Sequence, residues 1–111
     1  MLARPQLSVT DLRRAARHPV DFPVIATHRL LGDVPLHIVN LSAHGFMVRG
    51  KPVMGRGERL TVRLPEIGRI EAFLVWKTED RAGFQFERIL RLEQFSKLVS
   101  ASRPRHPSRS R

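Results

Sequence analysis

The chain has 111 residues, contains no cysteine and carries a formal net charge of +10. Its length allows one domain with one modest core, and the absence of cysteine excludes disulfides and thiolate metal sites. Because no apolar run approaches the ~18 residues needed to cross a bilayer and the first residues lack a secretory signal pattern, we expect a cytoplasmic protein without membrane insertion.

The N-terminal segment, residues 1–18, is basic and contains closely spaced arginines. Arg13 and Arg17 are four positions apart, and Arg14 lies between them. Arginine side chains repel one another without an anion, and their fork of donors matches phosphate oxygens. We therefore predict that this segment is flexible when empty and is drawn onto the rest of the domain by a phosphorylated ligand.

Short runs of alternating apolar and polar residues dominate the middle of the chain. The six runs are residues 20–27, 36–41, 46–49, 59–64, 70–77 and 84–87. Turn residues such as Gly, Pro and Asp separate them, at a spacing typical of an all-β barrel or sandwich. A closed barrel removes the exposed edges of a small sheet. Trp76 is in phase with the apolar residues of its run, so we expect it in the core.

A change of period marks the end of the barrel sequence. Leu92, Phe95, Leu98 and Val99 recur at helical spacing, which predicts an amphipathic helix over about residues 89–100 that packs on one barrel opening. Residues 102–111 contain no apolar side chain to bury and are expected to form a disordered basic tail. The predicted barrel and helix together occupy residues 19–101.

A second polar motif lies at the end of the second predicted strand. Asn40 and Ser42 are two positions apart, so on a strand their side chains project from the same face of the sheet. Gly45 follows where the chain turns without room for a β-carbon. The alternative is that Asn40 and Ser42 only hydrogen-bond their own turn. His44, within the motif, is expected to face solvent.

The order R-x-x-x-R, strand, N-x-S-x-x-G resembles the PilZ domain family, whose members are receptors for the bacterial second messenger cyclic di-GMP. The resemblance covers roughly residues 12–100 and includes the late strands around Trp76 and Phe84. It implies a six-stranded antiparallel PilZ-type β-barrel with a C-terminal amphipathic helix.

The same resemblance implies roles for the motif residues. Arg13 and Arg17 would grip phosphates and guanine faces of cyclic di-GMP. Asn40 would contact a guanine edge, and Ser42 a phosphate or a base. Gly45 belongs to the same binding motif. Arg14 is a further candidate, and the sequence leaves open whether it contacts the ligand or water.

These observations predict a stand-alone cyclic di-GMP receptor that relays the signal to an unidentified effector protein. We expect no enzyme: Ser42 and His44 have no orienting acid beside them. We expect no metal site or cofactor either, because the histidines do not follow a metal-ligand spacing and no cysteine joins them.

Two alternatives remain open from the sequence. A small basic β-barrel that binds RNA or single-stranded DNA fits the net charge of +10. Such barrels expose aromatic platforms for bases, whereas the aromatic residues here mostly lie in core phase. The basic tail can still give non-specific nucleic-acid contact. The other alternative is a PilZ-like adaptor that binds no nucleotide.

Overall fold

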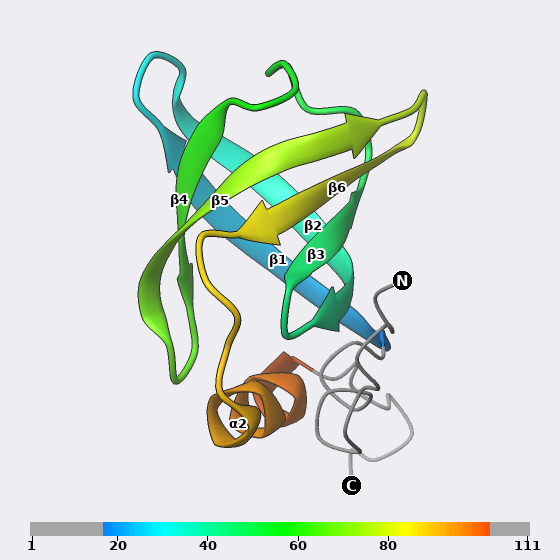
Figure 1. Cartoon of the computed structure of the whole chain (residues 1–111). Coiled ribbons are helices and arrows are strands. Elements are labelled where there is room, and N and C mark those ends of the chain that lie inside the picture. The colour runs from blue at the N-terminus through cyan, green and yellow to red at the C-terminus, as the bar shows by residue number, and fades with distance from the viewer. Residues whose placement is uncertain (1–16, 103–111) are drawn as a thin grey trace, which may run out of the picture.

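The computed structural model describes residues 17–102, which form a closed barrel of six strands and one helix (Figure 1). The elements are β1 (His18–His28), β2 (Gly32–Ser42), β3 (Gly45–Arg49), β4 (Arg59–Leu64), β5 (Gly68–Lys77), β6 (Arg81–Phe86) and α2 (Leu92–Ser102). All pairs are antiparallel in the order β1-β2-β3-β6-β5-β4, and β4 closes on β1 where Thr27 pairs with Thr61. The predicted fold class is confirmed.

The element boundaries differ from the predicted ones at both ends. His18, assigned to the flexible segment, is the first residue of β1 and pairs with Leu41. Ser102, assigned to the tail, is the last residue of α2, and its side chain is 1% exposed. The predicted flexible segment before residue 17 and the basic tail after residue 102 lie outside the described residues.

The core fills the barrel with the inward side chains of all six strands, and Phe46 stacks on Phe84 at its centre with ring centroids 5.0 Å apart. Two bulges change the predicted phase. The register of β2 shifts between Ile38 and Asn40, so Ile38 and Leu41 are both buried instead of lying on opposite faces. The regular alternation predicted over residues 36–41 therefore does not continue beyond the bulge.

The second bulge corrects the prediction for Trp76. Leu74 pairs with Phe84, but the register shifts and Trp76 pairs with Gly83. Leu74 is 1% exposed, whereas Trp76 is only half-buried and lies outside the core cluster. One extra residue in a strand rotates everything beyond it to the other face, and this moves the indole to the outside of the barrel.

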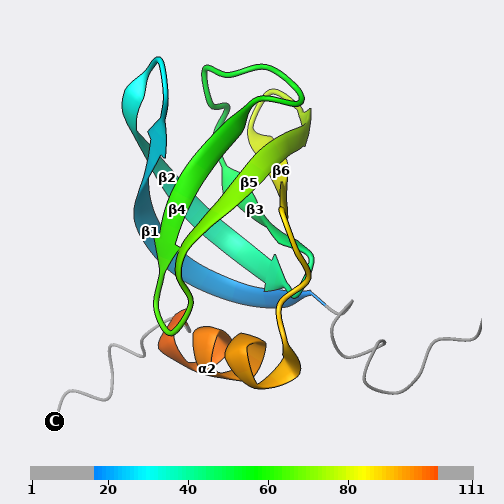
Figure 2. The same ribbon diagram turned by 60° about the vertical axis from the view of Figure 1, so that its left-hand side comes forward.

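Helix α2 lies across one opening of the barrel (Figure 2). Its buried face is formed by Phe95, Leu98 and Val99, and the ring of His18 meets Phe95 edge-on at 5.2 Å. The helix begins three residues later than predicted, and the preceding Leu90 N–H donates to the carbonyl of Ala43 in the β2–β3 turn. No helix among residues 17–102 is long and apolar enough to cross a membrane.

Candidate ligand site

The second motif occupies the tight connection between β2 and β3. Ser42 pairs with Gly45, and the Ser42 hydroxyl accepts the His44 backbone N–H at 3.1 Å. The hydroxyl therefore fixes its own turn, which is the local role that the sequence left open. It retains its donor capacity for a further partner.

Position 45 must be glycine because the neighbouring strand β6 leaves no space for a side chain. A β-carbon built on Gly45 would lie 2.0 Å from the carbonyl oxygen of Phe84 and 2.9 Å from the Cα of Gln85. Both are backbone atoms of β6, which cannot move without breaking the β3–β6 pairing. The predicted lack of space for a side chain is confirmed, and its cause is close strand contact.

Arg17 and Asn40 connect the two motifs across the barrel surface. The Arg17 guanidinium donates to the Asn40 side-chain oxygen at 3.1 Å, although 23 positions separate them in the chain. Asn40 reaches Arg17 because the bulge in β2 turns its side chain outward, while its amide nitrogen lies 3.9 Å from the sulfur of Met47. Arg13 and Arg14 lie outside the described residues.

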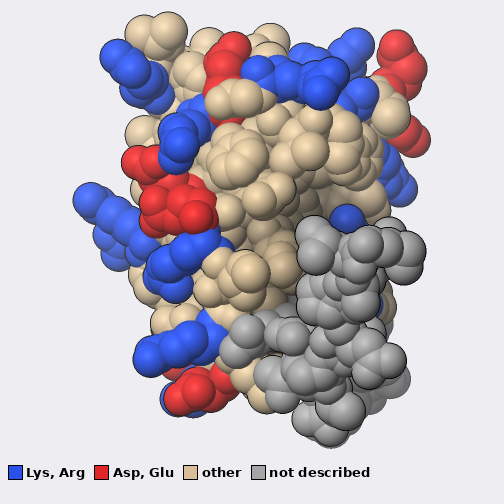
Figure 3. Space-filling model, viewed as in Figure 1, with Lys and Arg blue, Asp and Glu red and all other residues tan. Residues whose placement is uncertain are grey.

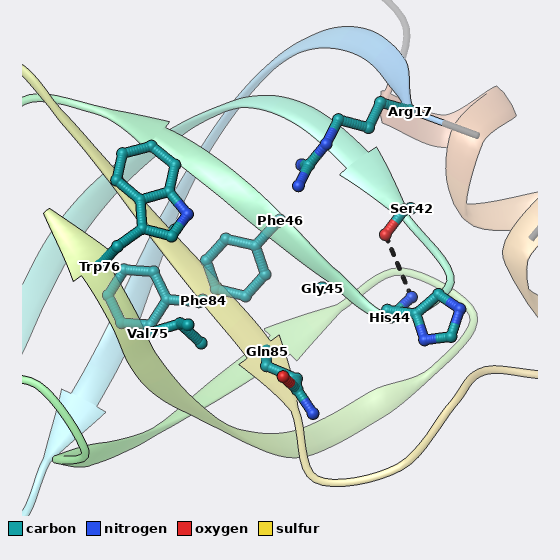
Figure 4. A pocket seen from close by; sticks show the side chains of 10 residues that line it. Arg17, Ser42, His44, Gly45, Phe46, Val75, Trp76, Phe84 and Gln85 are labelled. Carbon is teal, nitrogen blue, oxygen red and sulfur yellow. Dashed lines mark hydrogen bonds between the residues drawn. The ribbon is translucent and has the colours of Figure 1, made fainter. Parts of the chain in front are cut away.

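A cavity of about 280 Å³ opens beside this pair. Figure 4 shows the Arg17 side chain reaching toward the space between Ser42 and the indole of Trp76. The backbone of β3 and β6 contributes the floor, and the side chains of His44 and Gln85 stand at the other edge. Arg17 is the only described lining residue with a permanent charge, and none of them is a carboxylate.

Trp76 enters this cavity from β5 and was missed as a site residue by the sequence analysis. Its indole covers Gly83: a β-carbon there would lie 2.2 Å from the indole nitrogen. Because Gly83 has no side chain, the indole ring can pack directly against its backbone. A half-buried indole beside a guanidinium can hold a planar base by stacking and its phosphate by charge.

The wider face around the cavity is mostly uncharged. Figure 3 shows a hollowed, uncharged centre over β3, β5 and β6, with charged atoms of both signs along the upper and left edges. Among residues 17–102 no three His, Asp or Glu side chains converge in a way that could hold a metal ion. The polar side chains of this face are those of Arg17, Asn40 and Ser42, with His44 and Gln85 at the other edge of the cavity.

Comparison with known proteins agrees with the motif arrangement. No curated protein matches the chain. The family model of the PilZ domain matches residues 11–102, which is most of the chain and includes both motifs. PilZ domains are non-catalytic receptor domains for cyclic di-GMP. The chain belongs to the PilZ domain family.

Proposed function

We propose that this PilZ domain binds cyclic di-GMP in the cavity between Arg17 and Trp76. The observation that carries the proposal is the Arg17–Asn40 hydrogen bond of 3.1 Å, because it brings the two motifs together at the mouth of one cavity. A cyclic dinucleotide has two phosphates and two planar purines. The cavity offers a cation, a stacking surface and uncharged polar groups to match them.

Each group then has a distinct role. Arg17, together with Arg13 and Arg14, pairs with phosphate oxygens and with the acceptor edge of guanine, which arginine reads with two donors. The Asn40 amide contacts a guanine edge, and the Ser42 hydroxyl donates to a phosphate or base. Trp76 stacks on a base, because its indole is the largest lining aromatic ring outside the core cluster.

Isothermal titration with cyclic di-GMP tests this assignment, with cyclic di-AMP and GTP as controls. We expect saturable, guanine-selective binding, and the stoichiometry gives one or two ligands per chain. Arg63→Ala is the matched control for Arg17→Ala, since Arg63 is also exposed but lies on β4, away from the cavity. Equal affinities of these two variants would contradict the assigned site.

We further propose that binding orders residues 1–17 on the barrel and that an effector protein reads this change. Arg17 directly precedes β1, so neutralising the arginine cluster acts on the first residues of the barrel. Amide exchange of residues 1–18 with and without saturating ligand tests the relay. Unchanged exchange would contradict it even if the titration showed tight binding.

Single-stranded nucleic-acid binding gains support from one observation. Trp76 and Phe73 are both half-buried and stand outside the core cluster, contrary to the core phase predicted for Trp76. A second cavity lined by Phe73 and Arg56 adjoins the first and shares Val75 and Gln85 with it. Titration with a short single-stranded RNA at two salt concentrations distinguishes this function. Tighter binding of RNA than of cyclic di-GMP would favour it.

A further inference from the structure

Two loops at the barrel end opposite α2 (Figure 1) carry exposed aliphatic side chains. Leu30 and Leu31 belong to the β1–β2 turn and are 84% and 47% exposed. Val53, in the β3–β4 loop, is also 84% exposed. Single exposed aliphatic residues are ordinary. These three, called here the apolar loop surface, differ because buried and charged groups hold both loops in place.

The β1–β2 turn is fixed by a buried histidine. His28 is 5% exposed, and its Nδ1 atom accepts the backbone N–H groups of both Leu30 and Leu31 at 3.1 Å. Because Nδ1 is the acceptor, the ring proton lies on Nε2. The two leucines therefore project from a turn with a fixed backbone.

The β3–β4 loop is fixed by a lysine of β5. Lys77 donates to the carbonyl oxygens of Met54 at 2.8 Å and Pro52 at 3.4 Å, the two residues that flank Val53. The Met54 side chain is 2% exposed and anchors the loop in the core. Val53 consequently points outward between two held neighbours.

Glu58 joins the two loops. One carboxylate oxygen lies 2.8 Å from His28 Nε2, and the other accepts the Gly55 N–H at 3.1 Å. Hydrogen bonds from His28 and Gly55 lower the pKa of Glu58, so the bridging carboxylate is ionised at neutral pH. The loops are thus fixed before any partner arrives, which reduces the entropy lost on docking.

The charges around the apolar loop surface favour an anionic partner. Residues 29–31 and 50–58 contain Arg29, Lys51 and Arg56 against one acid, Glu58, whose two oxygens are already used. The other acids near these loops are Asp33 at the start of β2 and the Glu79 and Asp80 pair of the β5–β6 turn, and Asp80 lies 3.8 Å from Arg81. Lys51 lies 3.8 Å from Glu79 of the neighbouring turn. Arg29 and Arg56 are exposed and form no ion pair with a described carboxylate.

We propose that this end of the barrel docks peripherally on an anionic phospholipid bilayer. The apolar loop surface enters the interface, and Arg29 and Arg56 contact the headgroups. A second copy of the chain is disfavoured because the same cations would face each other. Three aliphatic side chains on convex loops also provide much less area than a stable protein–protein interface buries, whereas a bilayer requires no matching groove.

The first test is cosedimentation of the full chain with vesicles of phosphatidylglycerol and phosphatidylethanolamine, and with phosphatidylcholine vesicles, without nucleotide. We expect the Leu30→Asn/Val53→Asn variant to bind the anionic vesicles about tenfold more weakly than wild type. The matched control is Ile89→Asn, which changes a 51% exposed aliphatic residue next to α2 and should bind as wild type does. Equal binding by all three proteins would overturn the proposal, because the basic terminal segments would then explain it.

A second test locates the contact. Because the chain has no cysteine, Leu31→Cys and Ile89→Cys each carry one polarity-sensitive fluorophore. We expect a blue shift on anionic vesicles for the label at position 31 and none at position 89. The opposite pattern, or no shift at 31 while the protein sediments, would overturn the proposal. Binding of the labelled proteins to cyclic di-GMP is measured separately, so that failure at one end of the barrel is distinguishable from failure at the other.

Discussion

The two ends of the barrel use their polar side chains in opposite ways. At the end where β2 meets β3, called here the motif end, Arg17 and Asn40 share one exposed hydrogen bond, and Ser42 accepts one backbone N–H. At the opposite end, which carries the apolar loop surface and is called here the loop end, His28 and Glu58 form a hydrogen bond with each other. Together they also accept three backbone N–H groups. One end retains unused donors, and the other uses its polar atoms to fix the backbone.

This difference shows how one small barrel can separate recognition from rigidity. A guanidinium has five N–H donors, and a single bond to Asn40 leaves most of those of Arg17 for an anion. A neutral ring that accepts two backbone N–H groups, as His28 does, has no acceptor left. Substitutions at the motif end should therefore change affinity more than stability, and those at the loop end should do the reverse.

Gly45 is the exception at the motif end, and its substitution should have the largest effect on stability. We expect Gly45→Ala to lower the free energy of unfolding by about 2–4 kcal/mol, because its β-carbon would meet the β6 backbone at 2.0 Å. Urea denaturation measures this. In the control Gly55→Ala, the new β-carbon meets only the Glu58 carboxylate at 3.1 Å. Similar midpoints for the two variants would mean that β3 and β6 are not in this close contact.

Arg17→Ala should show the pattern expected of a recognition residue. We expect a loss of about 2–4 kcal/mol in cyclic di-GMP binding for this variant, and likewise for Arg13→Ala, because each removes a charge-assisted phosphate contact. The Arg17 hydrogen bond is exposed, so thermal stability should be almost unchanged. Titration and thermal melting of each variant separate the two quantities. A variant that loses stability but keeps affinity would reverse the comparison between the ends.

Trp76→Ala should weaken binding less, by about 1–3 kcal/mol, the usual range for a base stacked on an aromatic ring. Because Trp76 is the only tryptophan of the chain, its fluorescence in the wild type should change on ligand binding and report the site directly. Phe73→Ala is the control, since Phe73 lines only the adjoining cavity. Unchanged fluorescence at saturating ligand would place the base elsewhere.

Sequence periodicity was sufficient for the architecture but not for the bulges. Alternation and turn residues predicted all six strands and the helix, because a barrel requires one buried face along each strand. The bulge near Trp76 leaves no mark in the alternation, because Val75 and Trp76 are both apolar. The bulge near Asn40 does change the phase, since the buried Leu36 and Ile38 are followed by polar Asn40 and buried Leu41. Their positions depend on pairing with the neighbouring strand, which a single segment does not contain.

The candidate site was accordingly only partly predictable. As predicted, Asn40 and Ser42 lie at the end of one strand and Gly45 follows where the chain turns into the next, and the Arg17–Asn40 contact agrees with the order of the motifs. Trp76 was assigned to the core because its strand was read without the bulge. The one available signal was Gly83, a glycine within a strand, which often marks close approach of another group.

The loop end should respond to acid, and this is the smallest effect we predict. Hydrogen bonds from His28 and then Gly55 lower the pKa of Glu58 below its ordinary value of 4.5. The carboxylate therefore contributes stability that is present above pH 4.5 and is lost as pH falls through the lowered pKa. We expect the difference in urea midpoint between pH 7 and pH 3 to be smaller in Glu58→Gln than in wild type.

The exposed Glu87, changed to Gln, is the control and should leave that difference as in wild type. Because no described carboxylate lines the cavity, Glu58→Gln should also leave cyclic di-GMP affinity at pH 7 unchanged. If this variant instead weakened ligand binding, the loops and the cavity would be coupled through β5, which carries both Lys77 and Trp76. The two ends would then form one cooperative unit, and a partner docked on the loops would alter the receptor's affinity for its ligand.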